Sequence, residues 1–303
     1  MDIIDCHVHI VETIAGFGRE GELRAVGDGS GRARYAGGSV IQLLPRQFGA
    51  DRVTARDLIA LMDEQGVDRA VLLQGNYYGF QNLASWEAME DYPQRLTGAA
   101  MYDPYAQGAS QVRAHLFEDL AFPAVKFECS VGSGLMALHP QLQLDDAVMD
   151  EAFSYAAQRG QVIILDIGKY ASPSWQIEAA RREILKYPSA TFVLCHLLAP
   201  SDRDHDIWRQ AMERLALPNV WMDISSLSHN LRDQAPWPKT RQWLAEARDI
   251  LGADRLLFGT DFPSALNEAP YEEYIRCVRD AACFSEEEKA LILCENAQEV
   301  FFS

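Results

Sequence analysis

Two histidines near the start of the chain have a spacing that suits metal binding. They lie in the run Asp5-Cys6-His7-Val8-His9. Side chains two residues apart in a β-strand point to the same side, so strict alternation places His7 and His9 together with Asp5 below them. Two imidazoles on one face can hold a divalent metal ion. Because unpaired imidazoles are costly in a buried strand, the pair predicts either a metal site or histidines satisfied by hydrogen bonds.

Three more side chains that can ligate a metal follow apolar runs later in the chain. Asp166 ends the run VIILD, His196 ends TFVLCH and Asp261 ends LLFGTD. Taken singly, such an aspartate can cap a helix and such a histidine can be a satisfied core residue. If the runs are parallel strands of a barrel, however, their carboxyl ends converge on one axis. We therefore expect these side chains to meet His7 and His9 around one ion.

Other polar residues at the ends of apolar runs are candidates for substrate binding. Lys126 and Glu128 lie two residues apart in AVKFEC, so we expect them to line the barrel as an ion pair near the substrate. Asp223 follows the apolar start of the run VWMDIS, where it either binds substrate or caps the next helix. His139 and His229 lie in loops and are expected to be exposed.

Bringing these side chains together requires a regular alternation of strands and helices. Strand-like apolar runs occupy residues 3–10, 69–74, 96–102, 124–129, 162–167, 191–195, 220–224 and 255–259. Helical spacing of apolar residues occurs between them, for example at 55–65 and 146–158. Nearly continuous apolar runs that alternate with helices indicate parallel strands covered on both faces. Eight such units predict one α/β domain over residues 1–303, a (β/α)8 TIM barrel, with a doubly wound open sheet as the rival.

Residues 11–50 interrupt this alternation. The segment contains nine glycines and five arginines, including Arg34, and lacks a strong periodicity. Because it follows the first strand, in a barrel it lies over the C-terminal rim, where such folds carry their active sites. We expect a lid whose arginines, Arg34 among them, bind a substrate carboxylate. Oligomer contacts or local disorder are the other interpretations.

Composition narrows the class of protein. With 303 residues, 48% of them apolar, the chain can bury a large core, which excludes a mainly disordered protein. A net charge of −17 repels polyanions, so neither nucleic acid nor an anionic membrane is an expected partner. No apolar run approaches the ~20 residues of a membrane span, no signal peptide precedes the first strand, and the six cysteines form no CxxC pair. We expect a cytoplasmic protein with a small-molecule substrate, and a homodimer remains open.

In combination, these segments resemble a known family. The start DCHVHI, the histidine of FVLCH, the segment FGTDFP and the closing ENAQEVF are similar to the amidohydrolase superfamily. More narrowly, they resemble its amidohydrolase-2 branch, typified by aminocarboxymuconate-semialdehyde decarboxylase, from residue 2 to about residue 302. The resemblance implies one divalent metal ion, commonly zinc, bound by His7 and His9. It also implies that Asp261 is a ligand that handles a proton and that His196 lies near the metal-bound water or substrate.

The chain departs from the family pattern at Asp166, where the family usually has a third imidazole ligand. If Asp166 ligates the metal, two histidines and two carboxylates neutralise the ion, and harder ions such as Mn²⁺ compete better with zinc; iron is a further option. If Asp166 hydrogen-bonds instead, three protein ligands remain. Other branches of the superfamily carboxylate a lysine at the position of Lys126 to bridge two metals, so a two-metal site stays open.

Two chemistries are compatible with such a site. In hydrolysis, a metal-activated water attacks an ester, lactone or amide carbon, Asp261 accepts the proton and His196 stabilises the oxyanion. In non-oxidative decarboxylation, the metal binds the leaving carboxylate and a proton is delivered to the ring carbon. The resemblance implies cyclic or aromatic acids as substrates, and Asp166 removes a feature typical of the decarboxylase site, which favours a hydrolase. A barrel that binds metal or ligand without catalysis is the third interpretation.

Overall fold

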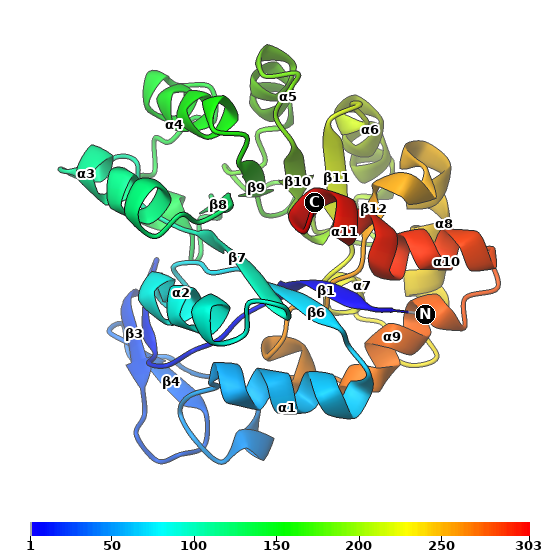
Figure 1. Ribbon diagram of the computed structural model, residues 1–303, viewed down its shortest axis with the longest axis horizontal. Helices are drawn as coiled ribbons and strands as arrows, with labels where there is room; N and C mark the ends of the chain where they lie inside the picture. Colours follow the sequence, from blue (N-terminus) through cyan, green and yellow to red (C-terminus); the bar gives the residue numbers. More distant parts are fainter. Residues whose placement is uncertain (1) are drawn as a thin grey trace.

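Eight parallel strands form the centre of the molecule (Figure 1). The computed structural model describes residues 2–303. The strands pair in sequence order: β1 (Ile4–Val8), β6 (Arg69–Leu72), β7 (Leu96–Ala100), β8 (Ala124–Glu128), β9 (Val162–Asp166), β10 (Phe192–Leu194), β11 (Val220–Asp223) and β12 (Leu256–Leu257). The sheet closes because the backbone N–H of Cys6 donates to the carbonyl of Phe258 at 2.9 Å and Val8 bridges Phe262 in parallel. The predicted (β/α)8 barrel is confirmed, and each predicted run contains one observed strand.

Helices surround the barrel. They are α1 (Ala55–Gln65), α2 (Asn82–Asp91), α3 (Ala109–Ala114), α4 (Ala147–Gln158), α5 (Ile177–Lys186), α6 (His205–Leu215), α7 (Leu227–Leu231), α8 (Pro238–Leu251), α9 (Tyr271–Arg279), α10 (Glu286–Ala290) and α11 (Asn296–Phe301). The two helices predicted from apolar spacing are confirmed as α1 and α4. Each begins after a side chain that caps it: Thr54 accepts from the N–H of Asp57, and Asp146 accepts from the N–H groups of Val148 and Met149. No helix within residues 2–303 is both long and apolar enough to cross a membrane.

Two apolar layers stabilise the barrel. The larger layer lies between the strands and the surrounding helices. The smaller one fills the barrel interior, and α11 lies across the opening that faces the viewer in Figure 1. Its buried members come from all eight strands, the segments that directly follow them, and α11: Ile4, Cys6, Val71, Leu73, Ala99, Ala124, Val162, Ile164, Val193, Cys195, Trp221, Leu257 and Ala297. This interior plug closes one end of the barrel, which leaves the opposite end, at the carboxyl ends of the strands, open for polar side chains.

The segment after β1 folds into a small sheet of its own. β2 (Ala15–Gly18), β3 (Gly21–Ala25), β4 (Arg32–Tyr35) and β5 (Val40–Gln42) pair antiparallel in sequence order. The sequence does not reveal this sheet, because its many glycines dilute the alternation of apolar side chains. β2 lies against loops at the carboxyl-terminal rim: a Cβ on Gly16 would come within 2.1 Å of the carbonyl oxygen of Tyr77, and one on Gly18 within 2.7 Å of that of Gly132. Glycine at both positions therefore lets the sheet approach the rim.

An irregularity in β1 decides which side chains face the barrel interior. The register of β1 against β6 shifts between Asp5 and Val8. Cys6 belongs to the interior plug and His7 also faces the interior, so two consecutive residues point inward, as in a β-bulge. Asp5 points outward instead, where its carboxylate accepts a 2.5 Å hydrogen bond from the hydroxyl of Tyr271 in α9. The expectation that Asp5 shares a face with the two histidines is wrong, because strict alternation does not survive the register shift.

Candidate active site

His7 is fixed from behind by a buried carboxylate. Its Nδ1 lies 3.0 Å from an oxygen of Asp223, whose side chain is excluded from solvent. The other oxygen of Asp223 accepts from the backbone N–H groups of His196 and Ser225. Asp223 is not among the residues that line the cavity in front of His7. The expectation that it binds substrate or only caps a helix is therefore replaced by an orienting contact to His7, a role that its distance in sequence concealed.

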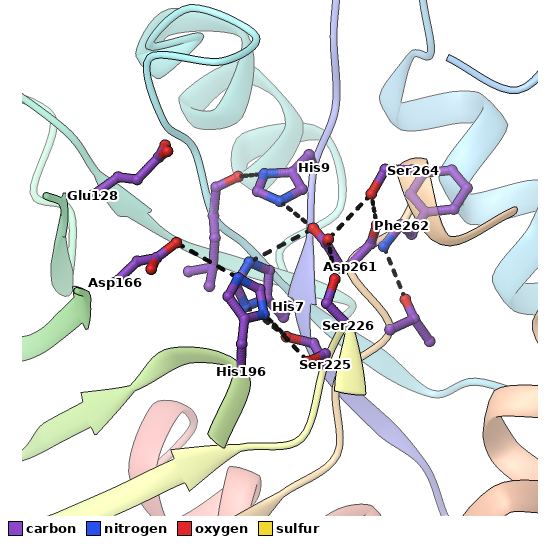
Figure 2. Close-up of polar contacts among 12 residues, drawn as sticks. His7, His9, Glu128, Asp166, His196, Ser225, Ser226, Asp261, Phe262 and Ser264 are labelled. Carbon is purple, nitrogen blue, oxygen red and sulfur yellow. Dashed lines mark hydrogen bonds and ion pairs between the residues drawn. The ribbon is translucent and has the colours of Figure 1, made fainter. Parts of the chain in front are cut away.

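His9 and Asp261 approach each other across the closure of the barrel (Figure 2). The Nδ1 of His9 lies 2.5 Å from the carbonyl oxygen of Leu73, and its Nε2 lies 3.0 Å from Oδ1 of Asp261. The Nε2 of His7 lies 4.0 Å from the same carboxylate oxygen. The second oxygen of Asp261 accepts hydrogen bonds from the hydroxyls of Ser226 at 2.5 Å and Ser264 at 3.1 Å. The structure thus brings His7, His9 and Asp261 together as the sequence predicts.

The protonation of these three side chains fits a divalent cation between them. Burial lowers the pKa of His7 to about 4 and also lowers that of His9, so both imidazoles are neutral at pH 7. Burial raises the pKa of Asp261, but contacts with His9 and His196 outweigh it and keep this carboxylate ionised. A neutral imidazole has one N–H, yet both nitrogens of His9 face acceptors. A cation ligated by both Nε2 atoms and Oδ1, which lie within 4.8 Å of one another, removes this mismatch.

A second group of side chains has similar spacing but is less suited to bind a metal ion. His7, His196 and Asp223 also have potential ligand atoms within 4.8 Å of one another. Hydrogen bonds already join Asp223 to His7 and to the backbone N–H of His196, and Asp223 is fully buried behind the cavity. Its oxygens orient the imidazoles, whereas those of Asp261 face the cavity. The first group is therefore the candidate metal centre.

Asp166 pairs with His196 instead of joining the metal ligands. The Nε2 of His196 lies 3.6 Å from Oδ2 of Asp166, and its Nδ1 lies 2.7 Å from the hydroxyl of Ser225. Burial acts against both charges, yet the pairing raises the pKa of His196 to about 9 and lowers that of Asp166 to about 2. The two side chains therefore form a buried ion pair. The prediction that Asp166 ligates the metal is not supported, because its carboxylate belongs to neither group with metal-ligand spacing.

A strained turn presents His196 to the cavity. Four consecutive residues from His196 to Ala199 have positive φ values of 46–61°. Non-glycine residues seldom adopt this region singly, and a run of them is costly. A contact from α6 supports the turn, because the indole N–H of Trp208 donates to the carbonyl of Leu197 at 2.8 Å. Asp261, with φ +69°, is the second site residue held in this region, so both wall positions store backbone strain.

Lys126 and Glu128 both face the cavity but do not pair. The ammonium of Lys126 lies 3.5 Å from Nε2 of His7. Glu128 accepts hydrogen bonds of 3.0 Å from the hydroxyls of Ser130 and Ser133. Within residues 2–303, no Lys126–Glu128 ion pair closer than 4.0 Å is formed, so the expected pair is corrected to two separate contacts. Burial and the charge of Asp166 raise the pKa of Glu128 to about 7.

The histidines and carboxylates line a cavity of about 160 Å³. Sequence reasoning missed further lining residues, namely Gly75, Tyr77, Tyr78, Ser133 and Ser264. The ring centroid of Tyr78 lies 5.1 Å from that of His9. The available signal was position: Tyr77 and Tyr78 lie in the loop after β6, at the same rim as the predicted ligands. Their run Gly-Asn-Tyr-Tyr contains no residue that titrates near neutral pH, so its sequence does not by itself predict a catalytic or metal-binding role.

The remaining sequence candidates lie outside this cavity. Arg34, in β4, is exposed, and its backbone pairs with Arg24 and Val40 within the small sheet. It lines neither the cavity at His7 nor the larger cavity beside it, so the structure gives no support to the prediction that it binds substrate. His139 lies outside the cavity. Its Nε2 is 2.8 Å from a carboxylate oxygen of Asp103. The mostly exposed His229 pairs with Glu268 at the rim of adjoining cavities.

Comparisons with known proteins identify the family and the fold. A family model for amidohydrolases, Amidohydro_2, matches residues 4–302. The search of curated proteins gives no match. The solved structures include an amidohydrolase from Burkholderia multivorans with bound zinc, with a TM-score of 0.74, 20% sequence identity and coverage of 99% of each chain.

Two further solved structures show how widely the fold is shared. One is a probable 2-pyrone-4,6-dicarboxylic acid hydrolase from Acinetobacter baumannii with citric acid bound, with a TM-score of 0.70, 20% identity and coverage of 100% of each chain. The other is a 2,6-dihydroxybenzoate decarboxylase from Rhizobium, with a TM-score of 0.59, 17% identity and coverage of 80% of this chain and 86% of that one. At these identities the likeness demonstrates the fold. The family match over nearly the whole chain shows more: this protein belongs to the amidohydrolase-2 family.

Proposed function

We propose that the protein is a metal-dependent hydrolase of a small cyclic substrate that carries a carboxylate and a lactone, ester or amide bond. The observation that carries the proposal is the convergence of His7, His9 and Asp261 at the floor of a cavity. Support for the substrate class comes from the fold relative described as a probable 2-pyrone-4,6-dicarboxylic acid hydrolase, whose name denotes a cyclic ester. The zinc in the Burkholderia multivorans structure favours zinc as the ion, with manganese or iron as alternatives.

The residues around the proposed ion would bind it and would also accept a proton during the reaction. A bound divalent ion would supply Lewis-acid polarisation of a carbonyl and activation of a water molecule. His7, His9 and Asp261 would hold it, with His7 oriented by Asp223 and His9 by the carbonyl of Leu73. Asp261 keeps one oxygen toward the histidines, while hydroxyls of two serines hold the other. As an ionised carboxylate facing the cavity, Asp261 is positioned to accept a proton during hydrolysis.

His196 supplies positive charge beside the candidate ligands, because its ring centroid lies 4.7 Å from that of His7. Its pairing with Asp166 keeps the imidazole protonated near neutral pH. A protonated imidazole in the cavity wall would stabilise negative charge that develops on a substrate carbonyl oxygen. The ammonium of Lys126, 3.5 Å from His7, adds a second cation beside the same position. In this proposal Asp166 acts on the reaction through His196.

Decarboxylation is the second candidate function. The likeness to the Rhizobium 2,6-dihydroxybenzoate decarboxylase supports it, because both functions are compatible with the same barrel. Lys126 beside His7 gives a specific reason to retain it, since an ammonium there can bind a carboxylate close to the candidate metal centre. The substrate carboxylate would then lie beside the candidate metal centre, at the position that the substrate carbonyl would occupy in hydrolysis.

One experiment separates these candidates. The purified protein is analysed for metal content, loaded with zinc or manganese, and incubated with lactones and carboxylated aromatics while acid release and CO₂ are both measured. We expect metal at one ion per chain and acid release without CO₂. Release of CO₂ would support the second candidate. A fully metal-loaded protein that turns over no substrate of either class would support a binding protein and contradict both enzymatic proposals.

A further inference from the structure

A second cavity lies beside the candidate metal centre and leads away from it. It has a volume of about 510 Å³ and shares Glu128, Asp166 and His196 with the inner cavity. Two cations of its lining, Arg19 and Lys169, do not reach the inner one. Arg19 lies between β2 and β3, and Lys169 lies in the loop after β9. A substrate held at the inner site can therefore extend into a cavity that is lined by two positive side chains absent from the inner one.

The backbone of Arg19 is held in place at this cavity. Its N–H donates to the carbonyl of Gly132, in the loop after β8, at 2.8 Å. The preceding Gly18 makes the contact sterically possible, because any Cβ there would come within 2.7 Å of that carbonyl oxygen. The turn between β2 and β3 thus packs directly on the loop that forms one wall of the cavity. The side chain of Arg19 is exposed, but its point of attachment is fixed.

The loop that carries Lys169 is also compact. Gly168 has φ +69° and donates its N–H to a carboxylate oxygen of Asp166 at 2.9 Å. A Cβ on Gly168 would lie 2.9 Å from the hydroxyl of Ser174 and 3.7 Å from Cβ of Ser130. The backbone carbonyl of Lys169 accepts from the N–H of Ser172 at 3.1 Å. The loops after β8 and β9 therefore pack on each other. This packing holds Lys169 in the cavity wall that also contains Asp166.

The charges of the outer cavity are arranged to receive an anion. Its two acidic residues already have partners, because Glu128 accepts from two serine hydroxyls and Asp166 pairs with His196. Its two histidines also have acidic partners, since His196 pairs with Asp166 and His229 with Glu268. Arg19 and Lys169 do not: in the part of the chain that the structure describes, neither takes part in an ion pair within 4.0 Å. In a chain of net charge −17, two free cations at one cavity form a local site of the opposite sign.

We infer that the outer cavity binds the substrate carboxylate through Arg19 and Lys169, which places the hydrolysed carbonyl at His7, His9 and Asp261. The inference rests on the proposed function and narrows it. It identifies the substrate as a cyclic acid whose carboxylate lies on the far side of the ring from the bond that is cleaved. It also favours hydrolysis over decarboxylation, because a carboxylate held in the outer cavity is kept away from the metal centre.

Binding of isophthalate tests the inference without turnover. This planar ring carries two carboxylates and no hydrolysable bond, so calorimetric titration into the metal-loaded protein reports binding alone. We expect Arg19→Gln and Lys169→Gln each to weaken binding about tenfold, since a charge-assisted contact is lost in each case. Arg34→Gln is the matched control, because it removes the same charge from the same small sheet outside both cavities. Unchanged binding in both test variants, or an equal loss in the control, would overturn the inference.

A pair of lactones tests the orientation of the substrate. The acid 2-pyrone-5-carboxylate and its methyl ester differ in one charge at a fixed distance from the ring ester. We expect Arg19→Gln to raise KM for the acid about tenfold, to leave KM for the ester unchanged, and to leave kcat for both nearly unchanged. Equal changes for both compounds would contradict the orientation. If no lactone is hydrolysed but the isophthalate result holds, the proposed reaction fails and the carboxylate site stands; if hydrolysis occurs and both variants bind normally, only the carboxylate site fails.

Discussion

The two ends of the barrel use the same strands for different purposes. At the closed end, strand residues such as Ile164 and Leu257 form an apolar interior plug with α11. At the open end, a few residues farther along each strand, the interior positions carry Lys126, Asp166 and other polar groups. The closed end gains stability from burial of apolar surface. The open end buries charges and strained backbone, which oppose folding unless each charge has a partner.

This difference separates stability from function along the barrel axis. Changes at the closed end should alter the free energy of unfolding and spare the site. Changes at the open end should alter metal binding or turnover. Removal of a buried charge there should raise stability only where that charge has no charged partner, because breaking a pair such as Asp166–His196 leaves the other charge unpaired. The following substitutions test that separation.

The largest effect is expected at the candidate metal centre. His7→Ala or Asp261→Ala removes one of three converging ligands, so bound metal should fall well below one ion per chain and kcat/KM should fall more than about 1000-fold. His196→Ala should lower kcat but retain the metal, because His196 pairs with Asp166 and lies outside the ligand group. Elemental analysis and steady-state kinetics provide the measurements. Full metal content in Asp261→Ala would contradict the assignment of the ligands.

The next effect is expected at the closed end. Ile164 is fully buried in the interior plug, so Ile164→Ala should lower the free energy of unfolding by about 2–5 kcal/mol through loss of packing and creation of a cavity. Metal content and KM should remain those of the unchanged protein, measured below the unfolding transition. A lowered metal affinity in this variant would show that the two ends are coupled.

A smaller effect is expected at the strained turn that carries His196. Trp208→Phe keeps most of the buried ring but removes the N–H that donates to Leu197, so His196 should lose its fixed orientation and kcat should fall about tenfold with metal retained. The nearby Trp243→Phe is the control, since its ring packs on Trp208 at a centroid distance of 4.5 Å. The nuclear magnetic resonance signal of the His196 ring should shift in Trp208→Phe and not in the control. Equal kinetic effects of both changes would indicate packing alone.

The smallest effect concerns the pH dependence of stability. The pKa of Glu128 is raised from an ordinary 4.5 to about 7 by burial and by Asp166. Between these values the folded state keeps the proton and the unfolded state loses it, so stability falls as pH rises from about 4.5 to about 7. Glu128→Gln removes this penalty and should raise Tm by about 2 °C at pH 8 with no change at pH 4. A lower Tm at pH 8 would show that the ionised carboxylate stabilises the fold.

Local patterns in the sequence predicted the barrel, with an open sheet as its rival, and identified three candidate metal ligands. The periodicity of apolar residues reports which elements form, because burial against a sheet or helix repeats with the geometry of the backbone. His7, His9 and Asp261 were identifiable because each follows or ends such a run and because the carboxyl ends of parallel strands converge. The position of Arg34 was not predictable in this way: composition located a group of arginines, but composition does not report which side of a sheet a residue occupies.

Tertiary structure decided the pairing of the polar groups, because these contacts join residues that are far apart in the chain. The register shift in β1 turned Asp5 outward, and Asp166 was drawn to His196 by a turn whose backbone the sequence does not predict. Electrostatic partners depend on distances of a few ångströms, which only the packed barrel determines. The sequence by itself therefore determined which residues gather at the rim. The fold determined which of them face the cavity, which hold one another, and which have no charged partner.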